Sequence, residues 1–171
     1  MNREFWKKRI AESIDRRKPL QREAIRLVFG EADFLPSLLL DQYKNILVFQ
    51  TLSAWMDRLK VELLGLFEEL LHPDGIVERN DPPVRDLEGI PRQKGFVRGG
   101  LPEELWIRSG DFSFLVDPLQ GQKTGLFIDQ QENQAAAARY AKGRILDLFC
   151  YQGGFSVPLS GAADEIVSVD A

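Results

Sequence analysis

The sequence predicts an α/β protein in which a small α/β domain is followed by the start of a Rossmann-like domain. Two stretches support this prediction. Residues 55–71 place leucines and a phenylalanine on one face of a helix, and residues 145–169 follow the order strand, glycine turn, helix, strand. We therefore expect a basic helical arm over residues 1–28, a small middle domain of β-β-α-β-β type over 29–118, and a Rossmann-like part over 119–171.

The first segment is basic. Residues 1–27 hold nine Lys or Arg against four Asp or Glu, although the whole chain carries a net charge of -4. Apolar residues recur at helical spacing from Phe5 to Ile14, and residues 21–28 predict a second short helix after Pro19. Such an arm can attract a phosphate backbone, but a solvated amphipathic helix carries similar charge, so both interpretations stay open.

The middle segment alternates strand and helix signals. Apolar runs at 37–41 and 46–52 predict a hairpin, and the helix over 55–71 ends before Pro73. A strand is expected over 75–79. These elements together predict a small α/β domain.

A Pro-Pro loop at 81–83 follows, and then a second hairpin. Residues 103–108 and 112–117 flank a Ser-Gly-Asp turn. Arg79 and Arg85 lie on either side of the Pro-Pro loop, and we expect them to pair with nearby carboxylates rather than to bind RNA phosphates.

The last segment has the pattern of a cofactor-binding sheet. Residues 130–142 predict an alanine-rich helix, and residues 145–149 and 165–169 predict strands buried on both faces, as in a parallel sheet. Gly153 and Gly154 follow the first strand, where their small size lets the backbone approach a nucleoside cofactor.

Two carboxylates indicate which cofactor this is. Asp170 ends the second strand, where a carboxylate can accept hydrogen bonds from both ribose hydroxyls. Asp147 lies at the tip of the first strand, and the G-x-G-x-x-G triplet of dinucleotide folds is missing, so a pyrophosphate would be repelled. S-adenosylmethionine, which carries a sulfonium and no phosphate, fits better than NAD.

The segment Gly-Gln-Lys-Thr-Gly at 121–125 suggests a phosphate loop at first sight. That loop requires glycine immediately before the lysine and again five residues earlier, where this chain has Gln122 and Asp117. A nucleoside triphosphatase is therefore disfavoured. A glycine turn leading into a helix capped by Asp129 is the simpler interpretation of this segment taken alone.

Taken together, two motifs resemble the large-subunit ribosomal RNA methyltransferase I family, which makes 5-methylcytosine, and more distantly the N7-guanine enzymes. They are GlyGlnLysThrGlyLeuPheIleAspGln at 121–130 and LeuAspLeuPheCysTyrGlnGlyGlyPhe at 146–155. The likeness extends upstream to residues 30–36, 41–43 and 77–85. In that family a small α/β domain joins an RNA-binding PUA domain to a class I methyltransferase domain.

The resemblance implies an S-adenosylmethionine-dependent RNA base methyltransferase that acts on 23S ribosomal RNA, with cytosine C5 favoured over guanine N7. It assigns cofactor binding to nine residues: Lys123, Thr124, Phe127, Asp129, Gln130, Asp147, Gly153, Gly154 and Asp170. Asp147 and the two glycines would form the main cofactor loop, and Asp170 would hold the ribose. The open edges of an unfinished sheet also favour a homodimer.

Three features depart from the family pattern. No PUA domain precedes Met1, Gln131 and Gln134 stand where the family has arginine, and the chain ends at Ala171. We therefore expect an incomplete fragment that does not methylate RNA alone, with its catalytic residues after Ala171. Cys150 stands where the family usually has serine, and we expect it to pack behind the cofactor loop rather than act as a nucleophile.

Composition removes several other classes. His72 is the single histidine and Cys150 the single cysteine, which disfavours a metal site, an intrachain disulfide and a Ser-His-Asp hydrolase. No apolar run approaches the length of a membrane span, so we expect a cytoplasmic protein. Two alternatives remain: a nicotinamide-dependent Rossmann oxidoreductase, and a non-catalytic module for RNA binding or dimerisation.

Overall fold

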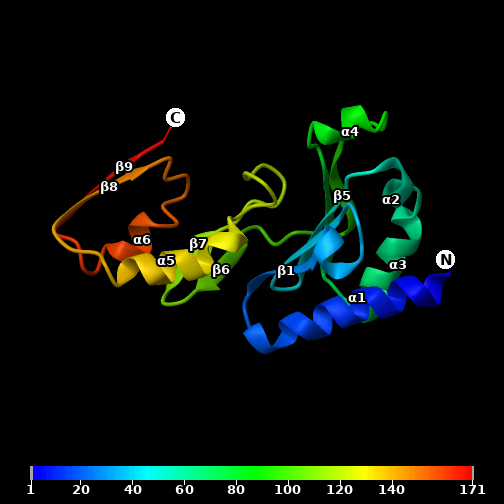
Figure 1. Ribbon diagram of the computed structural model, residues 1–171, viewed down its shortest axis with the longest axis horizontal. Coiled ribbons are helices and arrows are strands. Elements are labelled where there is room, and N and C mark those ends of the chain that lie inside the picture. The colour runs from blue at the N-terminus through cyan, green and yellow to red at the C-terminus, as the bar shows by residue number, and fades with distance from the viewer. Residues whose placement is uncertain (1, 171) are drawn as a thin grey trace.

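The computed structural model describes residues 2–170, which form two lobes that lie side by side (Figure 1). The larger lobe holds a five-stranded mixed sheet, and the smaller lobe holds two sheets of two strands each. Helices and strands are interspersed along the chain, which confirms the predicted α/β class. Within residues 2–170, no helix has the length and apolar character needed to cross a membrane.

The five-stranded sheet has its strands in sequence order. Strands β3 (Ile46–Thr51) and β4 (Gly75–Asn80) form the one parallel pair among its four pairings. Helices α2 (Ala54–Arg58) and α3 (Lys60–Leu71) provide the crossover between them. The other strands are β1 (Ala24–Phe29), β2 (Leu38–Tyr43) and β5 (Gln93–Gly99). The predicted hairpin is therefore confirmed as β2–β3, and the predicted strand over 75–79 as β4.

Helices cover one face of this sheet (Figure 1). They are α1 (Arg3–Arg17), α2 (Ala54–Arg58) and α3 (Lys60–Leu71). Trp6 and Ile10 of α1 pack with Phe67 of α3 in one buried cluster, to which strand β3 contributes Leu47 and Phe49. The predicted helix over 55–71 exists, but it is divided at Leu59 into α2 and α3.

The opposite face of the sheet is buried as well. Ile46 and Val48 of β3 belong to a second cluster, together with Leu105, Ile107 and Val116 from the following chain segment. Because neighbouring strand residues point to opposite faces, β3 is buried along its whole length. The smaller lobe therefore starts on the back of the larger sheet.

The smaller lobe contains the second hairpin and the βαβ unit. The hairpin is β6 (Trp106–Ser109) with β7 (Phe112–Leu115), and the βαβ unit runs through β8 (Arg144–Leu148), α6 (Ser156–Leu159) and β9 (Glu165–Val169). Strands β8 and β9 are parallel, as predicted. Helix α5 (Gln131–Ala138) precedes them, and the short helix α4 (Val84–Leu87) follows the Pro-Pro loop in the larger lobe.

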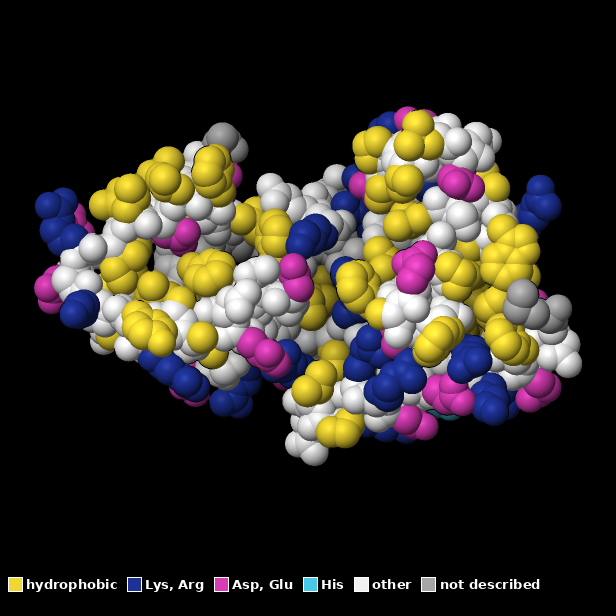
Figure 2. Space-filling view, in the orientation of Figure 1, with side chains coloured by type: hydrophobic (Ala, Val, Ile, Leu, Met, Phe, Trp, Pro, Cys, Tyr) yellow, Lys and Arg dark blue, Asp and Glu magenta, His cyan; other side chains and the backbone are white. Residues whose placement is uncertain are grey.

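One predicted helix is a strand, one strand was missed, and the two strands predicted to be buried are not. Residues 21–28 do not form a second helix, because Ala24–Phe29 pair with β2 as strand β1, where Arg26 lies opposite Asp41. Strand β5 was missed because its charged, mostly exposed residues lack an alternating apolar pattern. Strand β8 is not buried: Leu146 is 60% and Leu148 54% exposed, and Figure 2 shows hydrophobic side chains along this edge. Strand β9 is mostly exposed, with Val167 at 43% and Val169 at 46%.

The basic N-terminal helix is packed and ion-paired. All seven Lys and Arg side chains between residues 3 and 18 form ion pairs, with partners on α1 itself, on α3 and at Asp33. Figure 2 shows basic and acidic side chains intermixed in this region. Much of the positive charge that the sequence concentrates here is thus compensated locally.

Asp33 fastens α1 to the sheet. This carboxylate is 2% exposed and accepts hydrogen bonds from Arg16, from Arg17 and from the backbone amide of Phe29, at 2.6 to 2.9 Å. Desolvation opposes its charged form, but the bonds from Arg17, Phe29 and Arg16 outweigh it and lower the pKa of Asp33.

We expect Asp33→Asn to lower the free energy of unfolding near neutral pH by about 2 to 3 kcal/mol, because two guanidinium groups lose their counter-charge. Since the folded-state pKa is depressed, this stabilisation is present above the unfolded value of about 3.9 and is lost as the pH falls through the folded value. Urea unfolding at several pH values should therefore show the difference from wild type shrinking in acid.

The matched control is Asp15→Asn, which removes an exposed carboxylate paired with Lys18. It should change stability by no more than about 0.5 kcal/mol. Equal losses in both variants would contradict a special role for Asp33.

Candidate functional site

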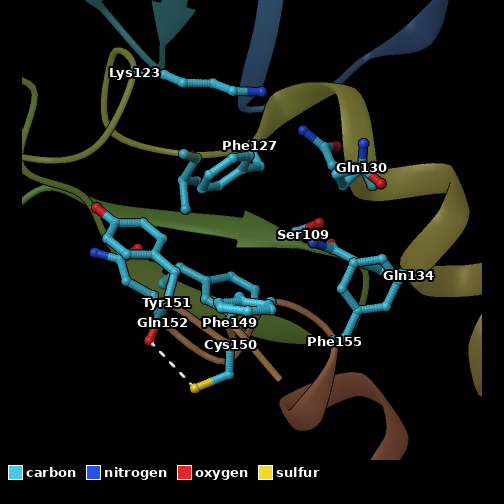
Figure 3. Close-up of a pocket in the computed structure, with 14 residues that line it drawn as sticks. Ser109, Lys123, Phe127, Gln130, Gln134, Phe149, Cys150, Tyr151, Gln152 and Phe155 are labelled. Atoms are coloured by element: carbon cyan, nitrogen blue, oxygen red, sulfur yellow. Dashed lines mark hydrogen bonds between the residues drawn. The ribbon is translucent and has the colours of Figure 1, made fainter. Parts of the chain in front are cut away.

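A pocket of about 330 Å³ lies in the smaller lobe, between the chain entering α5 and the loop after β8 (Figure 3). Side chains from two distant parts of the sequence line it. One wall carries Lys123, Leu126, Phe127, Gln130, Gln131 and Gln134, and the other carries Phe149, Cys150, Tyr151, Gln152, Gly154 and Phe155. Ser109 and Phe114 of the β6–β7 hairpin complete the lining.

Five aromatic rings contribute to the lining of this pocket, from Phe114, Phe127, Phe149, Tyr151 and Phe155. Phe127 and Tyr151 meet edge to face with ring centroids 5.7 Å apart, and the Lys123 ammonium lies 4.3 Å from the centre of the Phe127 ring. Lys123 is the one charged side chain in the lining that the structure describes. A pocket that combines aromatic rings with uncharged amide side chains is suited to a flat heterocycle of low charge.

Asp129 balances the lysine. Its carboxylate lies 3.1 Å from the Lys123 ammonium. Partial burial opposes ionisation, but the hydrogen bonds from Lys123 and Gln130 hold the pKa of Asp129 below its ordinary value. The pair therefore keeps this part of the pocket wall close to electrically neutral.

The loop after β8 has an unusual backbone. Phe149 and Tyr151 have φ angles of 62° and 48°, a left-handed conformation that non-glycine residues seldom adopt. The amides of Phe149 and Cys150 donate to the Val169 carbonyl, and the Tyr151 amide donates to the Asp170 carboxylate. These bonds to the end of β9 hold the loop in the shape that directs its aromatic side chains at the pocket.

Asp147 caps the start of helix α6. Its carboxylate accepts the Ser156 backbone amide at 3.1 Å and the Ser156 hydroxyl at 2.6 Å. In a dinucleotide fold, the amino terminus of the corresponding helix receives the pyrophosphate. Here a carboxylate of the protein already occupies that position, which disfavours a phosphate group in the same place.

Two glycines allow the chain at 121–125 to turn tightly. A Cβ atom on Gly121 would lie 2.6 Å from the Asp117 carbonyl oxygen and 2.9 Å from the Cα of Gly125. The Tyr151 hydroxyl also packs here, and it accepts a hydrogen bond from the Gln122 amide at 3.0 Å. The turn therefore joins the two walls of the pocket.

The structure brings together only part of the set of residues predicted from the sequence. Lys123, Phe127, Gln130 and Gly154 line the pocket. Asp129 pairs with Lys123, Asp147 caps α6, Gly153 belongs to the same loop, and Asp170 binds the Tyr151 amide. Thr124 points elsewhere: it is 1% exposed and donates to Asp41 of the larger sheet at 2.6 Å.

Tyr151, Phe155 and Gln134 also line the pocket, although the sequence did not predict them as site residues. Their presence in or beside the two motifs was the available signal, but aromatic residues there are equally compatible with a core. Cys150 is half-buried and lines the pocket. Among residues 2–170, the structure shows no group of His, Cys, Asp or Glu side chains that could hold a metal ion.

Both arginines beside the Pro-Pro loop form ion pairs, as expected, but only Arg79 does so with one of the neighbouring acids that were predicted, Glu78, Asp81 and Asp86. Arg79 pairs with Asp81 at 3.0 Å, whereas Arg85 reaches Asp57 at the end of α2 at 3.1 Å. Each is almost fully buried. Neither is therefore available on the surface for an RNA phosphate.

Known proteins share sequence and fold with this chain. No family model matches the chain. The ribosomal RNA large subunit methyltransferase I of Tolumonas auensis is 41% identical over 155 residues, which are 88% of this chain and 39% of that protein. The chain is related to the ribosomal RNA large subunit methyltransferase I family. It spans less than half the length of the curated relatives it matches.

Solved structures show that the fold is shared. A candidate SAM-dependent methyltransferase from Streptococcus mutans superposes with a TM-score of 0.84 at 24% identity, over 99% of this chain and 45% of that chain. A candidate methyltransferase complexed with S-adenosylhomocysteine gives the same values. The lobes described above thus recur, in this arrangement, within longer methyltransferase-like proteins.

We expect Gly121→Ala to destabilise the pocket wall, because a methyl group would overlap the Asp117 carbonyl and the Gly125 backbone. The cost should be about 1 to 3 kcal/mol, as for other overpacked sites. Thermal unfolding gives the overall change, and hydrogen exchange at residues 117–127 gives the local one.

Gly161→Ala is the control, since a Cβ atom there would meet nothing within 4 Å. That variant should match wild type in both measurements. If Gly121→Ala also matched wild type, the close approach would not constrain the turn.

Proposed function

We propose that this chain is the part of an S-adenosylmethionine-dependent methyltransferase that holds the cofactor, and that the whole protein modifies a base of large-subunit ribosomal RNA. The carrying observation is the aromatic pocket formed by two motifs of the sequence, 121–130 and 146–155, in a relative of the methyltransferase I proteins. The solved structure with S-adenosylhomocysteine, which shares this fold, supports the same cofactor class.

The electrostatics of the site fit this cofactor. Asp147 at the start of α6 places a carboxylate where a dinucleotide would bring a phosphate. The rings of Phe127 and Tyr151 offer apolar surface for the adenine base. Asp170, held beside the pocket by its bond to the Tyr151 amide, is proposed to accept the ribose hydroxyls.

Four further predicted residues are proposed to contribute to cofactor binding by their places around the pocket. Gly153 and Gly154 belong to the loop that the cofactor approaches, and Gln130 and Lys123 lie on the opposite wall. When bound, the cofactor would supply an electrophilic methyl group. The contribution of this chain would be to bind and orient that group and to exclude water, which fixes the geometry of transfer.

The proposal extends to finer points that the relatives suggest. Cytosine C5 of 23S ribosomal RNA is the favoured target over guanine N7, and a cytoplasmic location follows from such a substrate. We propose that residues 119–171 begin a larger Rossmann-like domain, since Leu146, Leu148, Val167 and Val169 are exposed on β8 and β9. A homodimer remains a prediction, and measuring the molecular mass by sedimentation equilibrium would test it.

Calorimetric titration separates the candidate functions. Binding of S-adenosylhomocysteine without binding of NAD supports the methyltransferase, and the reverse supports an oxidoreductase. A non-catalytic RNA module would bind RNA in a salt-dependent manner, with no effect of S-adenosylhomocysteine on that binding. Absence of S-adenosylhomocysteine binding to the whole protein would overturn the proposal.

We expect Asp170→Ala to weaken S-adenosylhomocysteine binding by about tenfold to a hundredfold, since charge-assisted hydrogen bonds of roughly 1.5 to 3 kcal/mol are lost. Asp164→Ala removes another exposed carboxylate just before β9 and serves as the control. Unchanged affinity in Asp170→Ala would remove the ribose assignment.

We expect Cys150→Ser to retain methyl transfer in the complete protein, because the two side chains are nearly isosteric and the thiol is proposed to pack rather than react. Transfer of labelled methyl groups to ribosomal RNA measures this directly. Loss of activity in a normally folded variant, or RNA trapped covalently on Cys150, would show that this cysteine is the nucleophile.

A further inference from the structure

The wall of the pocket is attached to the larger sheet through a buried chain of hydrogen bonds. Its members are the Leu126 amide, Tyr43 of β2, Thr124, Asp41 of β2 and Arg26 of β1, and we call this chain the relay. Tyr43 and Asp41 are fully buried, and Thr124 nearly so. Residues more than 80 positions apart in the sequence thereby come into contact.

The chemistry of the groups fixes the direction of every bond in the relay. The Asp41 carboxylate can only accept, so the Thr124 hydroxyl donates to it at 2.6 Å. Because the single hydroxyl proton of Thr124 is used in that bond, the Thr124 oxygen accepts a hydrogen bond from the Tyr43 hydroxyl at 2.9 Å. Tyr43 in turn accepts from the Leu126 amide at 3.2 Å. The three hydrogen bonds therefore run in one direction, from the Leu126 amide to the Asp41 carboxylate.

Arg26 supplies the counter-charge. It donates two hydrogen bonds to Asp41, at 2.8 and 2.9 Å, from the neighbouring strand. Its own pKa is raised, first by the hydrogen bond with Asp41. Burial, together with the nearby Asp41 charge, raises the pKa of Tyr43, which keeps this hydroxyl a donor across the physiological range.

A second attachment lies a few residues earlier in the wall. The buried Arg79 of β4 donates to the carbonyl oxygens of Pro118 and Gly121, both at 3.0 Å. The chain from 118 to 126 is thus held at both ends by strands of the larger sheet. Lys123 and Phe127, which face the pocket, lie between or directly beside these attachments.

We infer that Asp41, Tyr43 and Thr124 are positioning residues for the cofactor pocket: without lining it, they hold its Lys123–Phe127 wall in place from the larger sheet. The inference rests on the proposed function where it concerns the cofactor. The larger lobe then contributes to cofactor binding in addition to connecting domains. Fixing a wall before binding reduces the conformational freedom lost when the ligand enters.

Thr124→Val and Thr124→Ser make a matched pair. Valine keeps the shape but removes the hydroxyl, which leaves Asp41 and Tyr43 without their shared partner, whereas serine keeps the hydroxyl. We expect valine to weaken S-adenosylhomocysteine binding by about three- to tenfold and serine to restore it to within about twofold of wild type.

Tyr43→Phe provides an independent variant, because it removes the donor to Thr124 and the acceptor for the Leu126 amide. It should weaken S-adenosylhomocysteine binding by a similar factor. Its control is Tyr140→Phe, which removes the hydroxyl of an exposed tyrosine after α5 and should leave the affinity unchanged.

Hydrogen exchange on the same proteins tests the attachment without any ligand. In Thr124→Val and Tyr43→Phe, amides of residues 121–127 should exchange faster by about tenfold, while those of β2 and β3 keep their protection. Unchanged exchange in both variants would overturn the relay, and faster exchange with unchanged S-adenosylhomocysteine affinity would overturn its positioning role. If wild type itself failed to bind S-adenosylhomocysteine, the proposed function would fail, while exchange would still decide whether the relay holds the wall.

Discussion

The buried carboxylate of Asp41 is the constraint that ties the wall of the pocket to the larger sheet. A charge with no exposure to water must be paired and hydrogen-bonded, or its burial costs several kcal/mol. Arg26 satisfies it from within the larger sheet, and Thr124 satisfies it from the smaller lobe. The requirement to solvate this group therefore fixes the pocket wall against the sheet with a directionality that apolar contact alone would not give.

The larger sheet can perform this role because both of its faces are covered. Helices α1 and α3 cover one face, and the chain around Leu105, Ile107 and Val116 covers the other. Such a sheet offers a rigid base for polar groups that project toward the smaller lobe. The opposite wall of the pocket depends on a different support, the bonds of its left-handed loop to the end of β9. The Tyr151 hydroxyl and the Gln122 amide join the two walls.

Prediction from sequence succeeded where a local pattern reports a local structure. The β2–β3 hairpin, the amphipathic helix and the parallel βαβ unit all have periodicities that depend on their own residues. It failed where partners elsewhere in the chain decide. Residues 24–29 become a strand because β2 offers a pairing edge, and β5 is an edge strand with too little apolar character to be recognised.

The sequence by itself determined the α/β class, the two glycine-containing motifs and the preference for a cofactor without phosphate, because these follow from residue chemistry at short spacing. Only the tertiary structure decided which motif residues face the pocket. Lys123 and Phe127 do so, whereas Thr124 turns to a carboxylate 83 positions earlier. Neighbouring residues of one motif point in opposite directions because the buried Asp41 carboxylate of the larger sheet requires a hydrogen-bond donor. Residue spacing within the motif cannot indicate this, because Asp41 is distant in the sequence.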